Sequence, residues 1–131
     1  MVTARLERQL VAAMPARMGL LAEVSGALKD AGVDISAISA YERDGVAKFL
    51  LVTGDVARSA ATLGSLGADV SERTAVAVTL PDEPGTLQQV AARITEAGIN
   101  IFYIYGTADE GAEQATIIFK TADDEKVVGL F

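Results

Sequence analysis

Apolar and polar residues alternate in blocks along the chain, and these blocks predict strands and helices in a regular order. Residues 9–14 form an apolar run that stops at Pro15, as expected of a strand that leads into a turn. Apolar side chains then recur at intervals of three and four, which predicts an amphipathic helix: Leu21, Val24, Leu28 and Ala31. We expect this helix to end between Asp30 and Gly32, with the glycine as a left-handed cap.

The residues that follow show the period of two that is typical of strands. Residues 33–40 and 46–52 predict two strands, which are joined by an Asp-Gly hairpin turn. A second helix is expected over residues 56–66, with Asp55 as its cap, and a fourth strand over residues 68–71. The block therefore has the order strand, helix, strand, strand, helix, strand.

The same pattern occurs a second time. Residues 81–105 repeat residues 15–39 at a shift of 66 positions, since Pro15 matches Pro81. The matches fall at turn glycines and at core positions together: Gly19 with Gly85, Gly32 with Gly98, Leu21 with Leu87, Val24 with Val90, and Leu28 with Ile94. After the third strand the shift becomes 68, so the second hairpin, around residues 108–113, holds about two more residues. We interpret this pattern as an internal duplication.

Two copies of this unit, at residues 1–74 and 75–131, predict the α+β fold class. Each copy is expected to be a ferredoxin-like βαββαβ repeat, an antiparallel sheet with helices on one face. The second repeat is C-terminally incomplete, because Asp123 begins its second helix and Phe131 comes before its last strand. We favour a sequence cut short or limited to an ordered portion over completion by another chain, since an unpaired apolar edge promotes aggregation.

The residue types that are missing exclude several kinds of chemistry. The chain of 131 residues contains no histidine and no cysteine. It therefore lacks an imidazole base, a thiol nucleophile, a disulfide and a thiolate zinc site. No buried pair of carboxylates stands out either, so we expect no catalytic residues, no metal site, no cofactor and no enzymatic activity.

The charge is strongly negative and unevenly distributed. The formal net charge is −7 and the pI about 4.5, which argues against a nucleic-acid partner. Residues 1–74 hold 8 basic and 9 acidic side chains, whereas residues 75–131 hold 3 and 9, so the second repeat carries most of the charge. No apolar run approaches the roughly 20 residues of a membrane span, and no signal peptide is evident. We expect a cytoplasmic protein that binds neither nucleic acid nor membrane.

The segment PDEPGTLQQVAARITEAGIN carries a family signature. It resembles ACT domains, in which a strand ends in Asp-x-Pro-Gly, a helix with an apolar stripe follows, and Gly-Ile-Asn-Ile begins the next strand. The matching residues are Asp82, Pro84, Gly85, Leu87, Gly98, Ile99, Asn100 and Ile101. The first repeat keeps Gly19, Leu21, Gly32 and Ile35, but departs from the signature at Ala16, Met18 and Asp34. The resemblance covers nearly the whole chain and implies a small stand-alone tandem ACT protein.

The resemblance also implies a pocket for an amino acid in each repeat. The pocket of the second repeat would be lined by Gly85, Thr86, Leu87, Asn100 and Ile101, and that of the first by Gly19, Leu20, Leu21, Asp34 and Ile35. The chemistry of these residues agrees, because glycine admits a ligand close to the backbone, a helix amino terminus favours a carboxylate, and asparagine both donates and accepts. Structural explanations stay open beside this one. Gly85 is also suited to a tight turn, Asn100 to a cap, and Asp34 would repel a carboxylate.

Two functions of different kinds remain open at this point. The first is a regulatory sensor that binds a free amino acid and transmits its occupancy, through ACT-domain packing, to a regulated metabolic enzyme. The alternative is a non-enzymatic dimerisation or docking module with no ligand. A homodimer is expected, because helices cover one face of each sheet and the apolar strand residues on the other face need cover.

Overall fold

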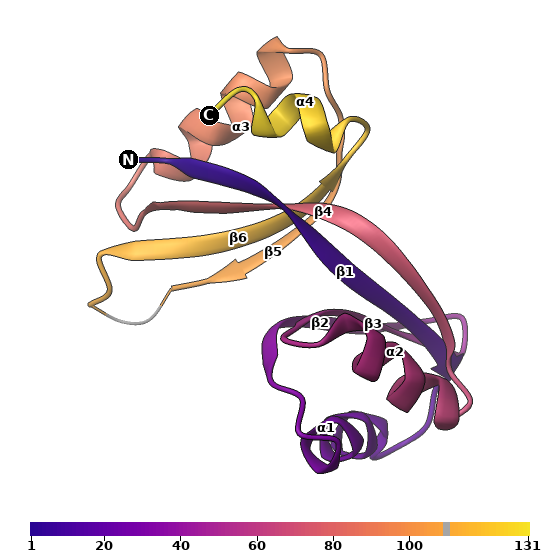
Figure 1. Cartoon of the computed structure of the whole chain (residues 1–131). Helices are drawn as coiled ribbons and strands as arrows, with labels where there is room; N and C mark the ends of the chain where they lie inside the picture. Colours follow the sequence, from indigo (N-terminus) through magenta and orange to yellow (C-terminus); the bar gives the residue numbers. More distant parts are fainter. Residues whose placement is uncertain (109–110) are drawn as a thin grey trace. The chain divides into compact units, whose positions relative to one another are not determined.

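Both repeats form strands and helices in the expected order (Figure 1) in the computed structural model, which describes residues 1–108 and 111–131. The strands are β1 (Thr3–Pro15), β2 (Ile35–Arg43), β3 (Val46–Thr53), β4 (Asp69–Pro81), β5 (Ile101–Thr107) and β6 (Gln114–Thr121). The helices are α1 (Leu20–Asp30), α2 (Val56–Ser65), α3 (Thr86–Glu96) and α4 (Asp124–Val128). The predicted α+β class with ferredoxin-like repeats is confirmed. Residues 109 and 110, part of the longer hairpin that we expected, lie outside the described residues.

The chain divides into two compact units. The repeat-1 unit is Arg8–Arg73, and the repeat-2 unit combines Met1–Glu7 with Thr74–Phe131. The long strands β1 and β4 each contribute residues to both units. Within β4 the division falls between Arg73 and Thr74, and residues 1–7 belong to the repeat-2 unit.

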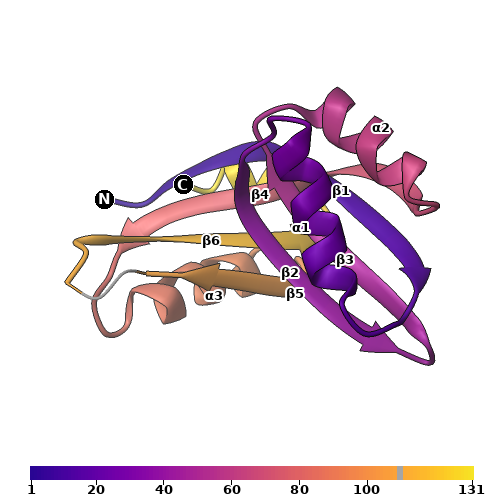
Figure 2. The same cartoon turned by 90° about the horizontal axis from the view of Figure 1, so that it is seen from below.

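The repeat-1 unit has the strand order β2-β3-β1-β4. Strand β3 pairs antiparallel with both of its neighbours, so that Phe49 lies opposite Ala12 on β1 and Ala40 on β2. Helices α1 and α2 lie on one face of this sheet (Figure 2). They close a core made mainly of Leu10, Ala12, Met14, Leu20, Val24, Leu28, Phe49, Leu51 and Leu63. The hairpin between β2 and β3 turns at Asp44 and Gly45, both with positive φ, as predicted.

The repeat-2 unit has the strand order β1-β4-β6-β5. Residues 3–7 of β1 take the place beside β4 that a last strand of the second repeat would occupy. Val2 and Ala4 pack against the core of this unit, which consists of Val76, Val78, Leu80, Val90, Ile94, Ile117, Phe119 and Val127. Helices α3 and α4 lie on one face of its strands (Figure 1). The chain's own first residues thus supply the strand that repeat 2 lacks.

Strand β1 begins at Thr3, although the sequence predicted a strand only from residue 9. Residues 3–7 carry two charged side chains and no apolar run, because they lie at the edge of the repeat-2 unit, where solvent reaches them. Strand β4 likewise continues from Asp69 to Pro81, where two shorter strands were expected. The middle of this strand, Glu72 to Thr74, is exposed and carries polar side chains. The hydrophobic pattern is interrupted there and therefore did not predict one continuous strand.

The predicted helix boundaries agree with the structure. The Asp55 carboxylate accepts a hydrogen bond from the amide of Arg58 at 3.0 Å, and Asp123 accepts one from the amide of Lys126 at 3.1 Å. Both aspartates are therefore caps, as expected. Helices α1 and α3 have 11 residues each, the longest among the described residues, whereas a bilayer crossing needs about 20.

The buried stripe of α1 differs by one position from the prediction. Leu20, Val24 and Leu28 are buried, whereas Leu21 is 55% exposed. Positions four apart on a helix stay closer to one face than positions three apart, so the stripe follows Leu20 and leaves Leu21 at its edge. The second repeat behaves in the same way, since Thr86 is buried and Leu87 is 50% exposed. Placing Leu21 in the core stripe was wrong.

Candidate functional site

Helices α1 and α3 begin differently from α2 and α4. Each follows a glycine in the left-handed conformation, with φ of 83° at Gly19 and 92° at Gly85. Residues with a β-carbon rarely adopt this conformation, so both turns require glycine. In the described part of the chain, no side chain caps either helix. In α3 the amide of Thr86 donates to the carbonyl oxygen of Glu83 at 3.3 Å, and the other first-turn amides of α1 and α3 can reach a ligand.

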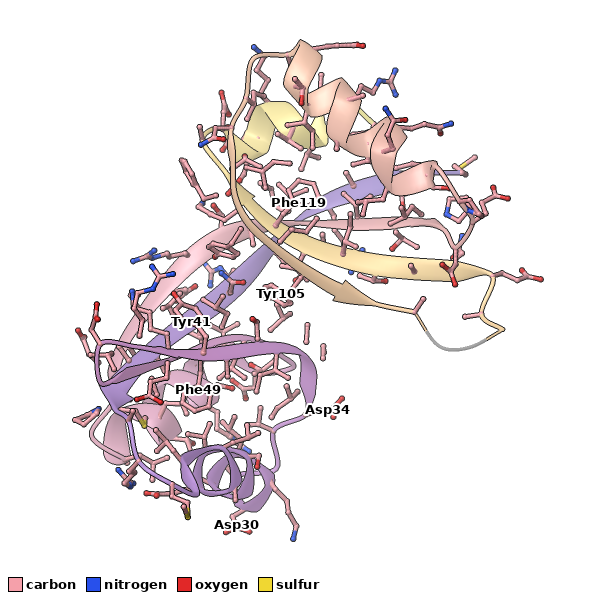
Figure 3. The ribbon with its side chains drawn as sticks, turned by 180° about the vertical axis from the view of Figure 1, so that it is seen from behind. Asp30, Asp34, Tyr41, Phe49, Tyr105 and Phe119 are labelled. Carbon is pink, nitrogen blue, oxygen red and sulfur yellow. The ribbon has the colours of Figure 1, made fainter. Side chains whose placement is uncertain are left out.

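A cavity of about 450 Å³ lies at the start of α1 in the repeat-1 unit. The turn and first residues of the helix form one side of it, with Ala16, Arg17, Met18, Leu20 and Leu21. The sheet forms the other side, with Ala40, Tyr41, Glu42, Ala47 and Phe49. Figure 3 shows Phe49 between the sheet and α1. Tyr41 pairs with Lys48, next to the pair of Ala40 and Phe49. Because side chains alternate along a strand, the Tyr41 side chain points to the sheet face opposite that of Phe49.

A smaller cavity of about 250 Å³ lies at the start of α3 in the repeat-2 unit. It is lined by Leu80, Pro81, Asp82, Glu83, Thr86, Leu87, Gly106, Ala108, Ala115 and Ile117. Eight of these residues correspond to residues around the first cavity by the shifts of 66 and 68 positions, for example Leu87 to Leu21 and Ile117 to Phe49. The duplication has therefore produced two cavities at equivalent places.

Small residues on the sheet leave room for both cavities. Ala40 lies opposite Phe49, and its equivalent Gly106 lies opposite Ile117. A β-carbon at Gly106 would stand only 2.7 Å from the side chain of Ile117 and from the carbonyl oxygen of Thr116. The floor of the second cavity is thus packed so tightly that only glycine fits there.

The five site residues predicted for each repeat do not line one cavity within a unit. Leu20 and Leu21 line the first cavity and Thr86 and Leu87 the second, beside Gly19 and Gly85. Asp34 and Ile35 lie beyond the other end of α1, as Figure 3 shows for Asp34, and line a separate opening of about 430 Å³. Asn100 and Ile101 lie in the same way beyond the other end of α3. An 11-residue helix is about 16 Å long, so the two groups are far apart.

The two strand-start residues have a structural role through their main chains. The Asp34 carbonyl accepts a hydrogen bond from the amide of Gly54 at 3.0 Å, and the Asn100 carbonyl accepts one from Ala122 at 3.1 Å. The side chains of Asp34 and Asn100 are exposed. Main-chain hydrogen bonds therefore hold the turn after each helix. The side-chain amide of Asn100 and the carboxylate of Asp34 are not needed to stabilise it.

The tyrosines of β5 lie away from these cavities. Tyr103 and Tyr105 stack with their ring centroids 6.5 Å apart, so they share one face of the strand. Burial, and secondly the neighbouring Tyr103, raise the pKa of the Tyr105 hydroxyl well above its usual value. Neither residue lines the two cavities at the helix starts. This placement fits a packing role better than a place at the rim of either cavity.

A buried carboxylate in the repeat-2 unit has no counterpart in repeat 1, where the equivalent residue is Val56. Asp124 is buried and accepts hydrogen bonds from Lys120 at 2.6 Å, from Thr74 at 3.0 Å, and from the amide and hydroxyl of Thr121 at 2.9 and 2.7 Å. Burial alone would raise the pKa of Asp124, but these hydrogen bonds outweigh it and hold the pKa below the usual 3.8. Every acceptor position is in use, so the cluster is structural.

Sequence reasoning missed the cavity residues contributed by the sheet and by the first turn. Arg17, Glu42 and Phe49 line the first cavity, and none of them belongs to the family signature. Small residues at equivalent strand positions, Ala40 with Gly106 and Ala47 with Ala115, were the available signal. They become meaningful once the pairing of the strands is known.

Two ferredoxin-like repeats, each with a cavity over a glycine-capped helix, define a tandem α+β repeat protein. Residues 74–128 match the family model of the ACT domain. The second repeat is thus an ACT domain, as its signature indicated, and the first repeat shares its fold.

Solved structures with the same fold extend over the whole chain. Protein BT0572 from Bacteroides thetaiotaomicron is 21% identical with a TM-score of 0.87, and the alignment covers 97% of this chain and 87% of that one. The ligand-free regulatory subunit of aspartate kinase from Thermus thermophilus is 17% identical with a TM-score of 0.68, covering 98% and 93%. Aspartokinase III of E. coli, in complex with aspartate and ADP, is 20% identical with a TM-score of 0.62, covering 98% and 31%. No curated protein matches the chain by sequence.

Proposed function

We propose that this protein is a regulatory module that binds a free amino acid and has no catalytic activity of its own. The ligand site is the cavity at the start of a glycine-capped helix, at Gly19–Leu21 or at Gly85–Leu87. The ligand carboxylate binds the first-turn amides, and occupancy alters the affinity of the module for a regulated metabolic enzyme in the cytoplasm.

The observation that carries this proposal is the contrast between the two kinds of helix start. Asp55 and Asp123 each accept a hydrogen bond from one first-turn amide of α2 and α4, whereas no side chain of the described residues caps α1 or α3, which begin beside a cavity. An amino acid suits such a place, because its carboxylate takes the role of the missing cap. The fold of the aspartate kinase regulatory subunit is in keeping with this function.

The residues at the strand starts have a different place in the proposal. Asp34, Ile35, Asn100 and Ile101 do not reach the cavity of their own unit, so they would contact the ligand only from a neighbouring domain. We propose them as secondary contacts, with Asn100 favoured over Asp34, because an amide both donates and accepts whereas a carboxylate repels the ligand.

Calorimetric titration with the twenty amino acids tests the proposal directly. We expect at least one to bind with a dissociation constant in the millimolar range or below. Amide chemical shifts should then change at Gly19–Leu21 or at Gly85–Leu87, and not around Asp55, whose helix start is already capped. Absence of binding by all twenty at millimolar concentration would contradict the proposal.

One observation favours the alternative, a dimerisation or docking module without a ligand. Strand β5 ends the strand order of the repeat-2 unit and exposes Phe102 and Ile104, of which Phe102 is 59% exposed. Exposed apolar residues on an edge strand are suited to a protein partner, including a second copy in a homodimer.

A pair of substitutions separates the two functions. Asn100→Ala leaves the edge of β5 intact, so a docking module keeps its self-association, whereas Ile104→Ser weakens it. If the protein is a ligand-binding module, substitutions at the helix starts, Gly19–Leu21 or Gly85–Leu87, should instead lower its affinity for the amino acid. Sedimentation velocity and calorimetry on the same samples distinguish these outcomes.

A further inference from the structure

The two equivalent cavities offer a ligand opposite charges. Arg17 lies beside the start of α1, and its equivalent beside α3 is Glu83. Ala16 corresponds to Asp82, so the second cavity has two carboxylates where the first has a guanidinium. Among the described residues, no basic side chain lines the second cavity. A ligand carboxylate can therefore pair with Arg17 at the start of α1, in exchange for Glu23, whereas Asp82 and Glu83 repel it from the start of α3.

The sheet sides of the two cavities also differ in charge, in the direction opposite to the difference at the helix starts. Glu42 lies on the sheet side of the first cavity, and its equivalent in the second is Ala108. The first cavity thus holds a cation beside the helix start and an anion across from it. A zwitterionic amino acid carries the same two charges in reverse and fits this arrangement.

The apolar lining separates the two cavities further. Leu20 and Phe49 line the first cavity, where the second has the hydroxyl residue Thr86 and the smaller Ile117. Met18 and Leu21, both largely exposed, extend this apolar lining to the rim. The volume of about 450 Å³ falls within the range of about 300 to 1,000 Å³ usual for ligand sites, whereas about 250 Å³ falls below it.

Arg17 is also available for a ligand. Its guanidinium forms an ion pair with Glu23, and the two side chains are 50% and 41% exposed. Exposed ion pairs contribute little to stability, so exchanging the Glu23 carboxylate for that of a ligand costs little. Arginine also binds carboxylates through two parallel hydrogen bonds, which gives this residue an advantage over a lysine.

We propose that the repeat-1 cavity is the site that binds, and that its ligand is an amino acid with a bulky apolar side chain, such as leucine, methionine or phenylalanine. This inference rests on the proposed function and names the cavity and the class of ligand. The carboxylate binds Arg17 and the open amides of α1, the ammonium group faces Glu42, and the side chain packs on Leu20, Leu21 and Phe49. The site thus lies in the repeat that departs from the family signature.

Titration of the full chain with chosen ligands tests the charge requirements first. Leucine, methionine and phenylalanine are compared with glycine, aspartate and lysine. Leucinamide, which lacks the carboxylate, and 4-methylpentanoate, which lacks the ammonium group, then probe the two ends of the ligand. We expect each of the two analogues to bind at least about tenfold more weakly than leucine.

Variants identify the cavity. Arg17→Gln and Leu21→Gln should each weaken leucine binding at least about tenfold. The matched controls lie outside both cavities. Arg5 is an equally exposed arginine in an ion pair with Glu7, and Leu6 is an exposed leucine. Arg5→Gln and Leu6→Gln are expected to leave the leucine affinity within about twofold. Thermal unfolding of all four variants checks that they are folded.

Each contrary result has a distinct meaning. If Leu87→Gln weakens leucine binding and Leu21→Gln does not, the site is the repeat-2 cavity, and this inference fails while the proposed function stands. The same holds if glycine or lysine binds as tightly as leucine. If no amino acid binds, the proposed function itself fails. A change of self-association in Leu21→Gln without any ligand effect would make the first cavity a protein-docking surface and overturn the inference.

Discussion

The two repeats have the same fold but complete it in different ways. The repeat-1 unit takes all its elements from one continuous stretch, Arg8–Arg73, whereas the repeat-2 unit adds residues 1–7 from the other end of the chain. The repeat-2 unit also contains the buried Asp124 cluster and the tightly packed Gly106, where repeat 1 has Val56 and Ala40. Repeat 2 therefore has more positions at which one change should be destabilising, and repeat 1 has the larger cavity.

This comparison separates the family signature from the candidate binding chemistry. Repeat 2 matches the ACT family model, and its 13-residue spacing from Gly85 to Gly98 encloses a helix that repeat 1 forms equally well from Gly19 to Gly32. The residues that distinguish the two cavities, such as Arg17 and Glu83, lie beside the signature glycine. The signature thus specifies the turn and the helix, while neighbouring positions set the charge of the cavity.

Removal of residues 1–7 is expected to have the largest effect. It takes away the strand beside β4 and the packing of Val2 and Ala4 on the repeat-2 core, at a cost of about 3 kcal/mol or more. Amide hydrogen exchange should show that β5 and β6 lose protection before β2 and β3 do. Leu6→Gln, a change at an exposed position of the same segment, is the control. Equal loss of protection in both units would contradict the division described here.

A methyl group at Gly106 tests the difference between the two cavity floors. Gly106→Ala places a β-carbon within 2.7 Å of Ile117 and should destabilise the protein by about 1 to 3 kcal/mol. The reverse change at the equivalent position, Ala40→Gly, removes a methyl from an exposed strand site and should cost less than about 1 kcal/mol. Urea unfolding of both variants gives the comparison, and a similar cost for the two would show that the floors are packed alike.

The Asp124 cluster predicts a pH dependence that originates in repeat 2. Asp124→Asn replaces a buried, paired carboxylate and should cost about 1.5 to 3 kcal/mol at pH 7. The pKa of Asp124 lies below 3.8 in the folded protein, so its contribution is present above that pH and is lost as the pH falls through the folded pKa. The stabilities of wild type and variant should therefore converge in acid.

The neighbouring residue provides the control for that experiment. Asp123→Asn keeps a side-chain oxygen for the amide of Lys126, and asparagine caps helices as well as aspartate does, so this variant should stay within about 0.5 kcal/mol of wild type. Urea unfolding between pH 3 and pH 7 measures all three proteins. A gap between wild type and Asp124→Asn that does not change with pH would rule out the titration of Asp124.

Much of the fold could be predicted because its signals are local. The glycines after each helix, the Asp55 and Asp123 caps and the Asp-Gly hairpin act within a few residues of themselves. The first strand could not be predicted from residue 3, because its partner β4 lies some 70 positions away and its edge position tolerates charged side chains. Leu21 was placed in the core because Leu20 and Leu21 are both apolar. A stripe through either leucine has helical spacing to Val24 and Leu28.

The candidate site was predictable in part for the same reason. The helix-start residues, such as Gly19 and Gly85, were recognised from their turn chemistry and do lie beside cavities. Asp34 and Asn100 were grouped with them because of the family resemblance, and in each unit the intervening helix, about 16 Å long, separates the two groups. Glu42 and Phe49 come from strands that approach the helix start only after the sheet has formed.

The shared strand β1 has a consequence for how the chain folds as it is synthesised. The repeat-1 unit can form once Arg73 has left the ribosome, but residues 1–7 find their place only after the repeat-2 core, including Val127, has been made. Residues 1–7 are made before repeat 1 and are used after it, and joining them to their partners closes a long loop, which slows folding. Until then the edge of β4 is open, and a chaperone that shields such edges would act on this protein during that interval.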